Sequence, residues 1–138
     1  MKMNKIQNIV AICLFLIVVI NGCAFDVIHL KQIPTQIVSN GSQKASLRLE
    51  KDTTVSMNSG FDRLLKKRTV WIYVGTLSHG DVYKTSDQVL TVEDSHVHQA
   101  YIVIRGNKLL GFYLPVEKSY SPISDAVELS LQEIDINL

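Results

Sequence analysis

Beyond residue 43 the sequence is strand-like almost throughout, with short stretches that alternate apolar and polar residues at a period of two, and this pattern is the feature that most constrains its fold. Residues 47–49 and 127–131 follow the pattern, and residues 89–92 form a short β-branched run. Residues 70–74 are apolar or aromatic at every position, which is typical of a central strand buried on both faces. No segment keeps a helical period, although residues 61–66 could form one helical turn. The sequence therefore predicts an all-β domain, a small antiparallel β-barrel or β-sandwich of roughly six to eight strands.

The clearest local unit is a β-hairpin over residues 101–114. Two β-rich runs flank Gly106 and Asn107, a pair that can supply the positive φ angles of a tight two-residue turn. Pro115 follows the second run. Because proline has no N–H for the ladder, we expect the second strand to end there.

The alternation changes its parity near the C-terminus. Apolar residues fall on odd positions up to Leu131 and on even positions from Ile134 onwards. With a period of two, this change predicts a bulge or bend near residues 132–133. Without one, the strand would turn its apolar side chains to the other face.

The first 23 residues have the three parts of an export signal. Lys2 and Lys5 give a positive start, an apolar run extends from Ile9 to Ile20, and the small residue Gly22 precedes Cys23. The run has 12 residues, and a helix of that length spans about 18 Å. A bilayer core is about 30 Å thick, so a cleaved signal is favoured over a transmembrane anchor.

In these residues the chain resembles bacterial lipoprotein precursors, in which a cysteine directly after the signal receives a lipid. The resemblance covers residues 1–23. It implies that a diacylglyceryl group is attached to the sulfur of Cys23, that signal peptidase II cleaves between Gly22 and Cys23, and that the new amine is acylated. Two or more acyl chains hold a protein stably, because each buried methylene contributes about 0.8 kcal/mol.

The resemblance divides the chain into a signal peptide (residues 1–22), a lipidated N-terminus with a tether or edge strand (23–43), and a β-rich domain (44–138). The cleaved chain would have 138 − 22 = 116 residues, a single-domain length. It keeps 12 bases and 13 acids, a net charge of −1 with neutral histidines. That balance gives no general electrostatic reason to bind nucleic acid.

Ala24 bears on the membrane that would hold the protein. In Gram-negative lipoproteins, an aspartate after the lipidated cysteine commonly retains the protein in the inner membrane. With Ala24 in that place, the resemblance implies the outer membrane, on its periplasmic face. In a Gram-positive cell the same anchor would lie in the plasma membrane.

The histidines are the candidate metal ligands. His96 and His98 are two residues apart, so on a strand they point to one side, and that spacing can present two imidazoles to one ion. His79 would complete a site if its loop folded beside them. The alternative is a surface loop, since Glu93-Asp94-Ser95 has the composition of a turn. We expect no metal site and no cofactor.

A basic cluster at Arg63, Lys66, Lys67 and Arg68 has two interpretations. Such charges can contact lipid or lipopolysaccharide phosphates. They can also form a solvated loop that protects the following apolar strand from aggregation. The second interpretation is favoured, because the cluster is short and acids flank it.

No catalytic motif is present in the sequence. Ser42, Ser59 and Ser78 lie near glycines, but none stands in a Gly-x-Ser-x-Gly elbow. Carboxylates show no acid–base spacing, and there is no phosphate-binding glycine loop. The aromatic residues of the predicted strands are expected to be core, with one face as a possible binding patch; they are Trp71, Tyr73, Tyr101, Phe112, Tyr113 and Tyr120.

These observations favour a non-enzymatic, membrane-anchored lipoprotein whose β domain is an interaction module of the cell envelope. Its partners would be the membrane, through the lipid on Cys23, and an envelope protein. One alternative is an inhibitor-type binding protein, for example of cell-wall hydrolases. Another is an accessory lipoprotein of a secretion or conjugation assembly, including an exclusion factor.

Overall fold

The computed structural model describes residues 4–5 and 29–136, and residues 29–136 form a β domain. The predicted lipidation and cleavage positions, Gly22 and Cys23, lie outside the described residues. The strands of the described part are β1 (Ile33–Pro34), β2 (Ser46–Leu49), β3 (Thr53–Ser56), β4 (Asp62–Leu65), β5 (Val70–Leu77), β6 (Gly80–Thr85), β7 (Thr91–Glu93), β8 (Val97–Gln99), β9 (Tyr101–Arg105), β10 (Lys108–Leu114), β11 (Ser119–Glu128) and β12 (Leu131–Ile134).

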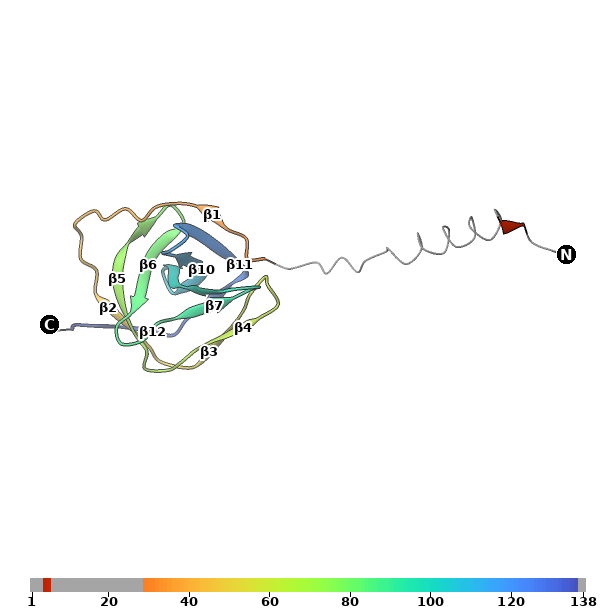
Figure 1. Ribbon diagram of the computed structural model, residues 1–138. Coiled ribbons are helices and arrows are strands. Elements are labelled where there is room, and N and C mark those ends of the chain that lie inside the picture. The colour runs from red at the N-terminus through yellow and green to blue at the C-terminus, as the bar shows by residue number, and fades with distance from the viewer. Residues whose placement is uncertain (1–3, 6–28, 137–138) are drawn as a thin grey trace.

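Eight of these strands form one curved sheet in the order β1-β11-β10-β9-β6-β5-β2-β12 (Figure 1). The other four form two hairpins, β3–β4 and β7–β8. Every pairing between these strands is antiparallel. The predicted all-β, antiparallel class is confirmed. The ladder of the described strands is open, with β1 and β12 as its edges.

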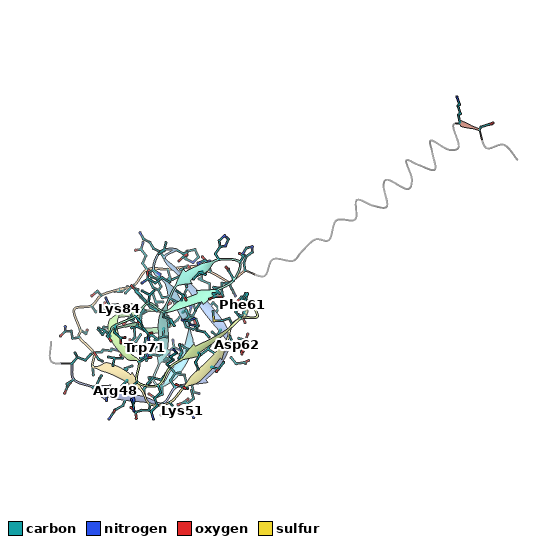
Figure 2. All side chains as sticks on the ribbon, turned by 60° about the horizontal axis from the view of Figure 1, so that its bottom comes forward. Arg48, Lys51, Phe61, Asp62, Trp71 and Lys84 are labelled. Atoms are coloured by element: carbon teal, nitrogen blue, oxygen red, sulfur yellow. The ribbon has the colours of Figure 1, made fainter. Side chains whose placement is uncertain are left out.

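The main core lies between the inner face of the sheet and the two hairpins. Trp71 and Phe112 project into it from the sheet, and Val55, Leu65 and Val92 reach it from β3, β4 and β7. Figure 2 places Trp71 inside the domain. Burying a Val, Leu or Phe side chain completely contributes about 1.5–3 kcal/mol to the free energy of folding. These apolar contacts are therefore the main interactions that hold the two hairpins to the sheet.

The outer face of the sheet carries a second, smaller core that the N-terminal strap (residues 33–38) covers. Ile33 and Ile37 pack there against buried residues that include Val82 and Tyr120. The strap begins as β1 beside β11 and ends at Val38, which pairs with Thr76 of β5. Residues 33–38, which we expected in a tether or edge strand, thus form an edge strand and a crossing of the sheet.

Gly75 makes the crossing of the strap possible. Its φ is +150°, and a Cβ at this position would collide with the Ile37 side chain and approach the Val38 carbonyl. The ladder between β5 and β6 shifts its register between Tyr73 and Gly75. The bulge and the missing side chain leave room for Ile37 on the sheet.

The predicted hairpin over residues 101–114 is confirmed. Arg105 pairs with Lys108, so Gly106 and Asn107 form the two-residue turn. Gly106 has φ +58°, as the first central residue of a type II′ turn requires. β10 ends at Leu114, directly before Pro115.

Two local predictions were wrong. Residues 61–66, expected as a possible helical turn, contain β4 instead, in which Leu65 is buried and Leu64 is exposed. The predicted bulge near residues 132–133 is absent, because β12 pairs with β2 in unbroken register. The chain breaks instead at residues 129–130, between β11 and β12.

Candidate functional site

Asp94 is the centre of a polar cluster at the N-terminal end of the described domain, beside Leu30. It lies in the turn between β7 and β8, and its side chain exposes 3% of its surface. One carboxylate oxygen, Oδ2, accepts a hydrogen bond from the Leu30 backbone N–H at 2.9 Å. The other, Oδ1, accepts one from the His96 backbone N–H at 2.7 Å. Asp94 therefore closes its own turn and fixes the chain at Leu30.

His98 lies between two carboxylates. Its Nε2 is 3.1 Å from Oδ1 of Asp94, and its Nδ1 is 2.6 Å from Oε1 of Glu117. A neutral imidazole has only one N–H, so this arrangement is fully satisfied only by the imidazolium, which donates from both nitrogens. The contact also joins the β7–β8 hairpin to the loop between β10 and β11.

The electrostatics of the cluster follow from these contacts. Burial alone would raise the pKa of Asp94, but hydrogen bonds from the Leu30 and His96 backbone and from His98 lower it to about 2. Burial opposes the charged form of His98, yet its hydrogen bonds to Glu117 and Asp94 raise the pKa of the imidazole above its ordinary value. Both shifts favour the charged pair, which exists between the lowered pKa of Asp94 and the raised pKa of His98.

The remaining polar groups of the cluster do not form a catalytic triad. The Ser95 hydroxyl lies 3.2 Å from Nδ1 of His29 and 2.9 Å from Nδ1 of His96. His29 turns the same nitrogen toward Asp94, at 3.8 Å. A triad needs the hydroxyl and the carboxylate on different ring nitrogens, so the arrangement does not activate Ser95.

The three candidate metal ligands are not brought together. His79 stacks on Tyr120 with ring centroids 4.1 Å apart, whereas the rings of His96 and His98 are 6.4 Å apart. Within residues 29–136, no three His, Cys, Asp or Glu side chains are grouped so that they could hold a metal ion. The nitrogens of His98 face carboxylates, and the cluster functions as a structural ion pair.

Sequence reasoning missed the roles of Asp94, Glu117 and Leu30. The sequence indicated a turn at Asp94, because an Asp side chain in a turn often accepts a hydrogen bond from the backbone N–H two residues later. It gave no indication of the contacts that Asp94 makes with Leu30 and His98. Glu117 is 19 residues from His98, and Leu30 is 64 residues from Asp94. These contacts depend on the sheet topology, which no local pattern encodes.

The other singled-out residues are spread over the domain. Arg63 is half-buried on β4, while Lys66, Lys67 and Arg68 are exposed in the turn before β5. Ser59 is buried and donates a hydrogen bond to the Glu93 carbonyl at 2.8 Å. Ser42 and Ser78 are exposed. Four of the six aromatic residues are buried and two are half-buried, so most are core as expected; they are Trp71, Phe112, Tyr113 and Tyr120, then Tyr73 and Tyr101.

The comparisons with known proteins leave the family open. No protein-family model matches the chain, and no curated protein or solved structure shows a significant similarity to it. In the part of the chain that the structure describes, no helix has the length and apolar character to cross a membrane.

Proposed function

We propose that this protein is a lipid-anchored lipoprotein of the bacterial cell envelope, whose β domain is a non-enzymatic binding module. The observation that carries the proposal is Cys23, which stands directly after a basic and apolar export signal. Ala24 favours the periplasmic face of the outer membrane in a Gram-negative cell. The membrane is the first partner, through the lipid on Cys23, and an envelope protein is the second.

The contacts at Leu30 support a membrane-proximal position for the domain. The Asp94 carboxylate accepts a hydrogen bond from the Leu30 backbone N–H, and a few residues further along the chain the strap pairs with β11 at Ile33. Seven residues lead from Cys23 to Leu30, and a chain of that length spans at most about 25 Å. A lipid on Cys23 would therefore keep the Asp94 cluster close to the bilayer surface. Within the expected tether or edge strand (23–43), residues 30, 33, 34 and 38 are bound to the domain by backbone hydrogen bonds or strand pairing.

The arrangement of polar groups supports binding over catalysis. His98 is held between two carboxylates, and Ser95 faces histidine nitrogens that no carboxylate orients for proton transfer. Ser59 is committed to a structural hydrogen bond. A histidine base in a triad is oriented by a carboxylate on its second ring nitrogen, and among the described residues neither His29 nor His96 has a carboxylate there.

The test is the intact mass of the protein extracted from separated inner and outer membranes. We expect a chain that starts at Cys23 and carries added acyl mass, in the outer-membrane fraction. The Cys23→Ala variant should lose both the acyl mass and the membrane attachment. Cys13→Ala is the matched control, because this cysteine is removed with the signal. An unprocessed wild-type chain without lipid would refute the proposal.

A further inference from the structure

Three loops meet at the end of the domain where the described chain begins. The loop between β3 and β4 is joined to the β7–β8 turn by the hydrogen bond from Ser59 to the Glu93 carbonyl, at 2.8 Å. The β7–β8 hairpin is joined to the loop between β10 and β11 by the contact of His98 with Glu117. The backbone N–H of Leu30 donates to the carboxylate of the β7–β8 turn. The three loops therefore lie together around the start of the domain.

Each of these loops presents an exposed apolar side chain. Val97 exposes 67% and Val116 exposes 75% of its surface, the two largest values among the exposed large hydrophobic residues of the described chain. They directly precede His98 and Glu117, so the contact between those two residues brings the valines to one end of the domain. Phe61, at the end of the β3–β4 loop, exposes 48% of its surface. Figure 2 shows it on the side where the described domain begins.

The polar residues of this end surround the apolar side chains without a strong net charge. Lys31 and Lys118 are exposed there, and so are the acids Asp62 and Glu93. Because the charges are of both signs, the end is not shaped for a partner of one charge. Exposed apolar side chains with a polar rim are typical of sites that contact a protein or a membrane.

The place where the chain enters the domain favours the membrane. Seven residues lead from Cys23 to Leu30, and they span at most about 25 Å. A lipid on Cys23 would therefore hold this end of the domain at the bilayer. The loop between β1 and β2 lies across the domain from that point (Figure 1). The acyl chains of the bilayer are then the apolar medium nearest to Val97 and Val116.

We propose that this end of the domain docks on the lipid bilayer, with Val97, Val116 and Phe61 at the boundary between headgroups and acyl chains. The apolar faces of interfacial helices are buried there to a depth of about 5–10 Å, and loop tips can reach the same layer. Lys31 and Lys118 keep their charged ends among the headgroups. This inference rests on the proposed lipid anchor and adds a fixed orientation of the domain on the membrane. Since the contact is apolar, it does not require anionic lipid.

The cysteine content allows one reporter at a time. Cys13 is removed with the proposed signal and Cys23 is blocked by the lipid, so Val97→Cys or Val116→Cys adds the only free thiol. An environment-sensitive fluorophore is attached there, and the lipidated protein is reconstituted into phosphatidylcholine vesicles. We expect both labels to shift to the blue and to be quenched by aqueous iodide several-fold less than a label on Val89→Cys. Val89 is the matched control, because it exposes 64% of its surface at the other end of the β7–β8 hairpin from the turn.

Variants and lipid content decide what the loops contact. With the label on Phe61→Cys, the double change Val97→Ser and Val116→Ser should increase quenching by iodide, whereas Val89→Ser should not. Equal quenching at positions 97, 116 and 89, in a sample whose intact mass includes acyl chains, would overturn this inference and leave the proposed anchor standing. A sample without acyl mass would overturn both. Protection that appears only at a high protein-to-lipid ratio would also overturn the inference, because a second copy would then cover the loops.

Discussion

Replacing Asp94 by Asn tests whether the carboxylate charge holds the chain at Leu30. The amide keeps the size of the side chain and one oxygen acceptor but removes the charge that faces His98. The pKa of Asp94 falls from the ordinary 3.8 to about 2 in the folded protein. At 1.36 kcal/mol for each pKa unit, this difference corresponds to about 2 kcal/mol of folding free energy. We therefore expect Asp94→Asn to lower the free energy of unfolding by about 2 kcal/mol near neutral pH.

The pH dependence of that loss follows from the sign of the pKa shift. Because the folded-state pKa lies below the unfolded value, the stabilisation is complete well above pH 3.8 and disappears as the pH falls through about 2. The difference between wild type and Asp94→Asn should shrink over the same interval. Urea unfolding of the full chain, followed by Trp71 fluorescence, measures it at each pH.

Asp125→Asn is the matched control, because Asp125 is exposed on β11. We expect this change to shift the free energy of unfolding by less than about 0.5 kcal/mol, as for surface substitutions in general. The reasoning is refuted if Asp94→Asn costs the same at acid and neutral pH. In that case the loss would come from the shape of the turn and not from its charge.

Four further predictions concern the rest of the polar cluster and the packing of the sheet. Glu117→Gln should lower the pKa of His98, measured by NMR titration of the imidazole. His98→Gln should cost stability below pH 6.5 and cost less as the pH rises through the raised pKa; a constant cost would contradict the ion pair. Gly75→Ala should destabilise by about 1–3 kcal/mol in urea unfolding, and Ile37→Ala should restore part of the loss. Phe112→Ala should cost about 3–5 kcal/mol in the same assay, and a loss below about 1 kcal/mol would contradict its place in the core.

The strands that could be predicted are those whose signals are local. The turn at Gly106 and the strand over residues 70–74 were each predicted from the residues that form them, and both are present where they were expected. β4 was not recognised, because its four residues include the adjacent pair Leu64 and Leu65. Only Leu65 faces the core, and a short apolar pair does not distinguish a strand from a helical turn.

The C-terminal parity change shows what the sequence could not resolve. Either a bulge or a change of face was consistent with the pattern, and the structure has the change of face. Leu131 packs against the inner core, whereas Ile134 lines a groove on the outer side with Ile72. The choice depends on the pairing of β12 with β2, a strand about 85 residues earlier.

The pairing of the strap with β11 has a consequence for the order of folding. Ile33 pairs with Tyr120, and Gln32 contacts Ser119, 87 residues away. Contacts of such separation form only after a long loop has closed, so the strap cannot dock until nearly the whole domain has been synthesised. The segment next to the proposed lipid anchor is thus among the last to be secured. A chain that stops before β11 would leave this segment without its partner strand and expose it to proteolysis.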